Sequence, residues 1–152
     1  MLKTSGLLAG ISLAVLIGLA GTSAAADEQV VKPLKMSKAE IAGDIFSSPE
    51  MVTVEQPEGP TYDVVSYLGT DDKFATGMYQ AGPSRYEIVD PWGVDEFMYF
   101  LKGSVTLTSS DGSVQIINAG EAVTIPKEWT GIWETEGYTK IYVIYSPTGE
   151  IE

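Results

Sequence analysis

The chain has 152 residues, with nine Lys and Arg against 21 Asp and Glu, and a net charge of −12. It contains no cysteine and no histidine. Disulfides, thiol nucleophiles, zinc fingers, Ser–His triads and imidazole–metal ligation are therefore excluded. Binding to nucleic acid or anionic lipid requires a local excess of Lys and Arg, which so acidic a chain lacks. We expect no nucleic-acid partner.

Residues 1–26 have the pattern of a secretory signal peptide. Lys3 supplies a positive charge, residues 7–20 form an apolar stretch, and Ala24-Ala25-Ala26 provides a small-residue cleavage site. The apolar stretch is short for a membrane span. We therefore expect cleavage, a periplasmic or secreted protein, and no membrane association of the mature chain. The alternative is an uncleaved anchor.

Residues 27–56 form a predicted N-terminal arm that contains one short helix. Ser37 and Glu40 have the spacing of a capping box and precede the apolar residues of a helix expected over about Lys38–Phe46. The prolines at positions 57 and 60 then mark a boundary, so residues 57–152 are predicted to form a separate barrel domain.

The segment after Pro60 consists of short runs of aromatic and β-branched residues separated by turn residues. Each separator contains the Gly, Pro, Asn or Asp that tight turns require. The runs cover residues 62–68, 74–80, 85–89, 96–101, 104–108, 113–117, 122–125, 132–135 and 140–145. This spacing predicts an all-β barrel or sandwich.

Two of these segments carry a more specific signal. Glu96 and Gly103 bound the string EFMYFLKG, and Gly120 and Pro126 bound the string GEAVTIP. The strings resemble the two half-motifs of the cupin family, and residues 74–145 resemble the single-domain cupins related to ureidoglycine aminohydrolase and to ethanolamine utilisation. The resemblance implies a cupin-type jelly-roll barrel in which Gly103 and Gly120 are turn or strand-boundary positions. It does not specify a function, because cupins host many unrelated chemistries.

The resemblance also implies a central metal held by histidines and one glutamate, and here this chain departs from the pattern. The positions of the three histidines are occupied by Asp90, Trp92 and Gly131, so that only Glu96 remains. One carboxylate cannot hold a transition metal against water. The sequence therefore predicts no bound transition metal and no cofactor. The alternative is an all-oxygen site for manganese, magnesium or calcium, built from Asp90, Glu96 and Gln80 or Gln115.

Strand alternation places Glu96 on one face with Met98 and Phe100. A carboxylate among apolar side chains needs a hydrogen-bond donor. Glu96 is then either a structural residue satisfied by Arg or Tyr, or an acid, base or ligand anchor at the bottom of a pocket. The candidate donors are Tyr79, Arg85, Tyr86, Trp133 and Tyr142. The side chains predicted to bind a ligand are Tyr79, Arg85, Trp92, Met98, Trp133 and Tyr142.

Three classes of function follow. The first is an exported, metal-independent cupin that binds a small molecule in an aromatic barrel pocket. The second is a metal-independent lyase, isomerase or hydrolase that uses Glu96 as a catalytic acid or base, with a tyrosine hydroxyl. The third is a structural or interaction barrel without a ligand. The resemblance to cupins also allows a homodimer.

Overall fold

The computed structural model describes residues 30–149 and 151. Every described helix and strand belongs to one unit, which begins at Pro33. The signal peptide predicted over residues 1–26 lies outside the described residues. Within the described part of the chain, no helix combines the length and the apolar character that a membrane span needs.

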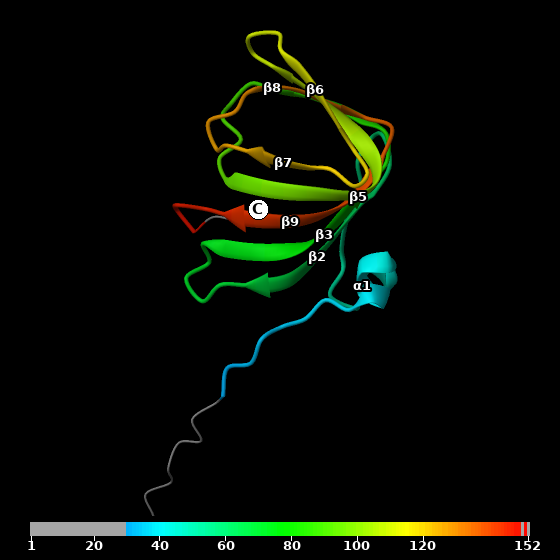
Figure 1. The fold of residues 1–152 in the computed structure, drawn as a ribbon, viewed down its shortest axis with the longest axis vertical. Helices are drawn as coiled ribbons and strands as arrows, with labels where there is room; N and C mark the ends of the chain where they lie inside the picture. Colours follow the sequence, from blue (N-terminus) through cyan, green and yellow to red (C-terminus); the bar gives the residue numbers. More distant parts are fainter. Residues whose placement is uncertain (1–29, 150, 152) are drawn as a thin grey trace, which may run out of the picture. The chain divides into compact units, whose positions relative to one another are not determined.

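The described residues form nine strands, and every pairing among them is antiparallel (Figure 1). The strands are β1 (Val52–Val54), β2 (Thr61–Leu68), β3 (Phe74–Ala81), β4 (Ser84–Ile88), β5 (Asp95–Ser109), β6 (Val114–Asn118), β7 (Ala122–Ile125), β8 (Gly131–Thr135) and β9 (Tyr138–Tyr145). The predicted all-β class is confirmed, and the curled sheet fits a cupin-type jelly roll.

Strand β5 belongs to two sheets and joins them. Its first part pairs with β9 and β7, in the sheet that continues through β3 and β2 to β1. Its second part pairs with β6 and β8, in the sheet that ends at β4. The two sheets therefore curl around a shared interior (Figure 1).

The sequence predicted two strands with a turn at Gly103, and this is wrong. Strand β5 is continuous through Gly103, and its register against β9 shifts between Phe100 and Lys102. Gly103 has φ +68°, and a Cβ atom there would collide with the Gly137 carbonyl oxygen. The glycine therefore marks a bulge that bends one long strand from the first sheet into the second. Gly120, by contrast, lies in the turn between β6 and β7, as predicted.

The N-terminal helix is shorter than predicted. The capping box at Ser37 and Glu40 is present and begins helix α1 (Lys38–Ala42). The helix ends at Gly43, which has φ +135°, and the chain continues as a 3₁₀ turn, η1 (Asp44–Ser47). Ile45 of this turn packs with Val64 of β2 and Met78 of β3. Met36, Phe46 and Met51 pack against the same cluster, so the arm from Met36 onward lies against the barrel.

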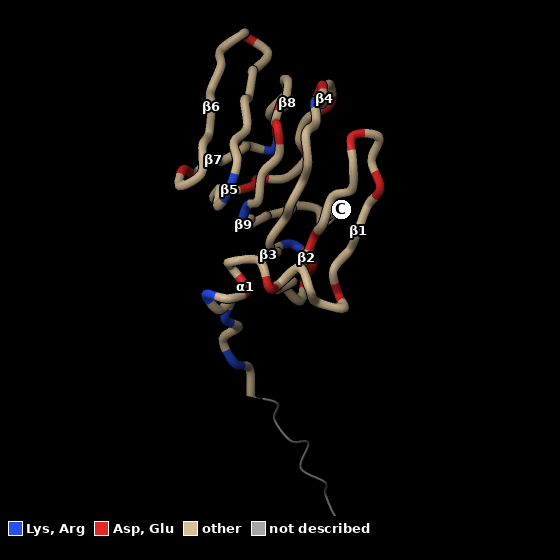
Figure 2. Tube along the Cα trace, turned by 90° about the vertical axis from the view of Figure 1, so that its right-hand side faces the viewer, with Lys and Arg blue, Asp and Glu red and all other residues tan. Residues whose placement is uncertain are grey.

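The main core lies between the two sheets. Strand alternation turns Met98 and Phe100 inward, where they pack with Val105 and Leu107 from the second part of β5. Trp133 and Tyr138 join the same cluster. Acidic residues are spread over strands and loops, while three of the nine Lys and Arg stand at positions 32, 35 and 38 (Figure 2).

Candidate functional site

A cavity of about 240 Å³ lies among side chains of both sheets. It is lined by residues of β2, β3, β4, β5, β8 and β9 and of the loop before β5. The lining residues are Asp63, Tyr79, Tyr86, Ile88, Trp92, Glu96, Trp133, Tyr138, Lys140, Tyr142 and Ile144. We call this cavity the barrel pocket.

A buried ion pair forms part of the wall of the barrel pocket. The Lys140 Nζ lies 2.6 Å from the Glu96 Oε1, and the two side chains are only 7% and 5% exposed. The second carboxylate oxygen, Glu96 Oε2, accepts a hydrogen bond of 3.1 Å from the Trp92 indole N–H. Both oxygens of Glu96 thus have a donor, as a carboxylate removed from water requires.

The ammonium group of Lys140 is surrounded by polarisable partners. It donates a long hydrogen bond of 3.4 Å to the Met98 Sδ. The ring centres of Tyr79, Trp133 and Tyr138 lie 5.4, 5.7 and 5.9 Å from the Nζ. These distances are within the range of cation–π attraction, which compensates part of the hydration that the buried cation has lost.

Strand register explains how these side chains meet. Lys140 on β9 lies directly between Tyr79 on β3 and Phe100 on β5, and Tyr79 lies opposite Asp63 on β2. Residues opposite one another in antiparallel strands share a face of the sheet. The row therefore brings Asp63 and Tyr79, from the consecutive strands β2 and β3, to the interior beside Lys140, from the distant strand β9.

Asp63 and Tyr142 form a second polar contact in the pocket. The Tyr142 hydroxyl donates a hydrogen bond of 2.9 Å to the Asp63 Oδ1. Burial raises the pKa of the Asp63 carboxyl above its ordinary value, although this hydrogen bond opposes the shift. Burial, together with the charge of Asp63, also raises the pKa of the Tyr142 hydroxyl, so Tyr142 remains a donor at neutral pH.

Gly77 makes the position of Tyr142 sterically feasible. The two residues are opposite one another on β3 and β9. A Cβ atom at position 77 would collide with the Tyr142 hydroxyl and with the Val64 carbonyl oxygen. The glycine therefore leaves the space in which the Tyr142 hydroxyl approaches Asp63.

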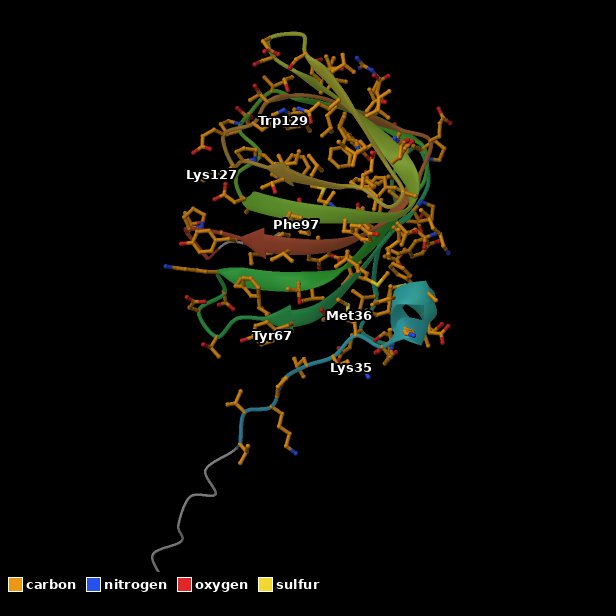
Figure 3. All side chains as sticks on the ribbon, viewed as in Figure 1. Lys35, Met36, Tyr67, Phe97, Lys127 and Trp129 are labelled. Carbon is orange, nitrogen blue, oxygen red and sulfur yellow. The ribbon has the colours of Figure 1, made fainter. Side chains whose placement is uncertain are left out.

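The three tryptophans of the chain pack together at the pocket. Trp92 stacks on Trp133, with ring centres 5.8 Å apart and an interplanar angle of 10°, and it meets Trp129 edge-on at 6.2 Å. The Trp129 indole N–H donates to the Ser109 hydroxyl at 3.1 Å. Figure 3 shows the side chains of this region, with Trp129 labelled. The cluster holds Trp92 where its indole can donate to Glu96.

Most residues that the sequence predicted for the site do line the barrel pocket. They are Glu96, Tyr79, Trp92, Trp133 and Tyr142. Met98 is fully buried and lies next to Lys140 rather than in the lining. Arg85 does not line the pocket: its side chain is 56% exposed and pairs with Glu134 at 3.3 Å. Strand alternation explains this, because the neighbouring Tyr86 is the residue of β4 that turns inward.

Sequence reasoning missed Lys140, Asp63 and Tyr138. The predicted donors to Glu96 were Tyr79, Arg85, Tyr86, Trp133 and Tyr142, whereas the donors are Lys140 and Trp92. A signal was present in the string YTKIYVIY of β9, where alternation places Tyr138, Lys140 and Tyr142 on one face. A lysine in that series faces the interior, and it then needs a carboxylate partner.

The donor set of this site does not fit the metal that the cupin resemblance implies. Lys140 and Trp92 already donate to the two oxygens of Glu96. At Gly131, a Cβ atom would collide with the Thr108 carbonyl oxygen, so the backbone leaves no space for a histidine side chain there.

The residues of the alternative, an all-oxygen metal site, do not come together either. Asp90, Gln80 and Gln115 are exposed, and they do not line the pocket. Among residues 30–149, no three carboxylate, His or Cys side chains gather closely enough to hold a metal ion.

Comparison with known proteins supports the fold and the cupin superfamily. Residues 68–142 match the family model of the EutQ-like cupin domain. The sequence matches no curated protein. The chain is therefore a cupin-fold domain similar to EutQ-like proteins, with a lysine–glutamate pair in its barrel.

Three solved structures illustrate the similarity. A DUF861-family protein from Pseudomonas syringae pv. tomato has a TM-score of 0.56 and 17% identity, over 62% of this chain and 43% of that protein. The Clostridium difficile EutQ protein has a TM-score of 0.52 and 18% identity, over 74% of this chain and 81% of that protein. A Rhizobium leguminosarum structure has a TM-score of 0.52 and 21% identity, over 76% and 99%. At these identities the similarity concerns the fold alone.

Proposed function

We propose that this protein is an exported, metal-independent cupin that binds a small molecule in the barrel pocket. The observation that carries the proposal is a cavity of about 240 Å³ with aromatic walls and the paired Glu96 and Lys140 in its lining. Well-packed apolar side chains are often as stabilising as a buried ion pair, or more so. A barrel that served only as a scaffold would therefore not need this arrangement for its stability. Apolar cavities with a few convergent polar groups are typical of ligand sites.

A second candidate is a metal-independent enzyme, and one observation moves its acid or base from Glu96 to Asp63. Glu96 is engaged by Lys140 and Trp92, so a proton taken up there would break a buried ion pair. Asp63 also faces the pocket, burial raises the pKa of its carboxyl, and the Tyr142 hydroxyl is 2.9 Å away. A carboxyl with a raised pKa can act as an acid or base, and the Tyr142 hydroxyl, whose own pKa is raised, stays protonated and holds the carboxyl in place.

The export part of the proposal rests on the signal-peptide pattern of residues 1–26. Mass spectrometry of the protein from the periplasm or the culture medium tests it. We expect a chain that begins at Asp27. A protein that retains its first 26 residues would contradict export by cleavage.

A fragment screen by ligand-observed NMR tests the binding function. Two neighbouring residues of β4 provide matched variants, because Tyr86 lines the pocket and Arg85 does not. We expect fragments that bind the parent protein to lose about tenfold in affinity with Tyr86→Ala and to bind Arg85→Ala as the parent does. Circular dichroism confirms that both variants are folded. The proposal is wrong if no fragment binds, or if binding is unaffected by Tyr86→Ala.

A further inference from the structure

We propose that the ligand of the barrel pocket is an uncharged ring with several hydroxyl groups, a neutral sugar or cyclic polyol, with one oxygen bound by the Lys140 ammonium group. The inference rests on the proposed function and specifies its ligand class. It combines three properties of the pocket: how its charges are paired, which hydrogen bonds they can still make, and how its walls are built.

The pocket holds one cation and two carboxylates. Lys140 pairs with Glu96, its charge also favours the ionised form of Asp63, and the neutral Tyr142 hydroxyl donates a hydrogen bond to Asp63. An anionic ligand at Lys140 would lie against the Glu96 carboxylate, only 2.6 Å from the same ammonium group. A cationic ligand at Glu96 would lie against Lys140. Each would put like charges together in a desolvated place, where their repulsion is large.

The aromatic faces also disfavour a cationic ligand. Cages of aromatic rings often bind ammonium groups. Here Tyr79, Trp133 and Tyr138 already have the Lys140 ammonium within 6 Å of their ring centres. The cation of this cage is part of the protein itself.

The polar atoms of the pocket can still make hydrogen bonds of both kinds. An ammonium group has three N–H donors, and within the described part of the chain Lys140 uses one for Glu96 and one for Met98. A carboxylate can accept about four hydrogen bonds, and Asp63 accepts one from Tyr142. The ligand must therefore accept from Lys140 and donate to Asp63. A hydroxyl group does both, and neighbouring hydroxyls on a ring do so at two points.

The walls of the pocket suit a single ring. Six of its eleven lining residues are aromatic, and Ile88 and Ile144 add apolar surface. Flat aromatic faces pack against the C–H face of a saturated ring, while the ring's hydroxyl groups point to the polar atoms. The volume of about 240 Å³ lies below the range of about 300–1,000 Å³ that is typical of larger ligands. The net charge of −12 also repels anions at a distance.

Titrations with three hexoses that differ in one group test the inference. The probes are galactose, galactosamine and galacturonate, which are neutral, cationic and anionic, together with the same three forms of glucose. Trp92 and Trp133 line the pocket, so tryptophan fluorescence reports binding, and calorimetry confirms it. We expect the neutral member of at least one series to bind about tenfold more tightly than both charged members.

Two further experiments extend the test. Neutral pentoses and cyclitols are titrated in the same way, so that the class does not depend on one ring configuration. Asp63→Asn is expected to weaken the neutral ring about tenfold, because a charged acceptor is lost. Arg85→Gln, on the outer surface, is the matched control and should bind the ring as the parent protein does.

The inference is overturned if a charged member binds as tightly as its neutral counterpart, if no neutral ring binds, or if Asp63→Asn binds the ring unchanged. These outcomes differ from failure of the proposed function. Should fragments bind through Tyr86 while neutral rings do not, the pocket is a ligand site for another chemical class. Should no fragment and no ring bind, both proposals are wrong.

Discussion

Two ion pairs of this barrel each join a basic side chain to a glutamate, and they differ in their exposure to water. Arg85 and Glu134 pair at 3.3 Å across β4 and β8, and their side chains are 56% and 49% exposed. Lys140 and Glu96 pair at 2.6 Å across β9 and β5, and their side chains are 7% and 5% exposed. Either member of the exposed pair can be solvated by water when its partner is absent. The members of the buried pair depend on each other.

An ion-pair contact does not by itself make its two residues necessary for the stability of the fold. An exposed pair between two strands contributes a fraction of a kcal/mol and weakens with salt. A buried pair is not by itself strongly stabilising, but removal of one member leaves an uncompensated charge. Loss of either Lys140 or Glu96 should therefore destabilise the barrel. The pair also holds a cation and a carboxylate next to the pocket.

The largest expected effect comes from Lys140→Met, which leaves the Glu96 carboxylate buried without its cation. We expect a loss of about 3–5 kcal/mol in the free energy of unfolding. The double variant Lys140→Met with Glu96→Gln removes both charges, so it should recover much of that loss. Urea denaturation at neutral pH measures all three proteins. A single variant within about 0.5 kcal/mol of the parent would mean that the pair is not coupled.

A smaller effect is expected when the space beside the Tyr142 hydroxyl is filled. Gly77→Ala places a methyl group where the Tyr142 hydroxyl and the Val64 carbonyl oxygen lie, so the neighbours must shift. Such overpacking costs about 1–3 kcal/mol. Gly82→Ala is the matched control, because its Cβ atom would meet only the Glu58 carbonyl oxygen at 4.0 Å. Equal melting temperatures for the two variants would show that the fit at Gly77 is not tight.

Asp63, which faces the same pocket, provides a test by pH. Its folded pKa lies above its ordinary value of 3.8, because burial disfavours the charged carboxylate. Ionised Asp63 therefore costs the folded state free energy as the pH rises through that pKa, and this cost is absent below the ordinary value. Asp63→Asn removes the cost. Relative to the parent, the variant should be most stable at neutral pH and lose this advantage as the pH falls toward 4.

Thermal melts of both proteins at matched ionic strength measure that difference. Only the difference is informative, because the many other carboxylates titrate equally in both. A stability difference that does not change between neutral and acidic pH would contradict the raised pKa of Asp63.

The sequence predicted the strands well because their signal is local. Alternating residues and turn residues gave eight of the nine strand locations, with β5 divided in two by Gly103. β1 was missed because three residues carry too little periodicity to stand out. Gly103 was misinterpreted because a glycine that bends a strand and a glycine that ends one look alike in a sequence.

The site was predicted only in part, and the reason why the rest was missed is physical. Motif positions led to Glu96, Trp92 and the aromatic walls, because these residues stand at recognisable spacings. The partner of Glu96 lies 44 residues later in the chain, on a strand whose register against β5 is set by the whole fold. Asp63 depends on the register of β2 against β3 in the same way. Pairings of this kind depend on the tertiary structure, and local sequence patterns do not specify them.

The smallest change in the free energy of unfolding is expected for the exposed pair of Arg85 and Glu134. Arg85→Gln should change the free energy of unfolding by no more than about 0.5 kcal/mol, because water solvates Glu134 when the guanidinium is lost. The remaining interaction should decrease further at high salt. A double-mutant cycle with Glu134→Gln, measured by urea denaturation at low and high salt, isolates the pair energy. A coupling energy as large as that of Lys140 and Glu96 would contradict the view that burial makes the interior pair indispensable. Near-zero coupling, together with a large loss for Lys140→Met, would show that the same contact matters only where water cannot replace the missing partner.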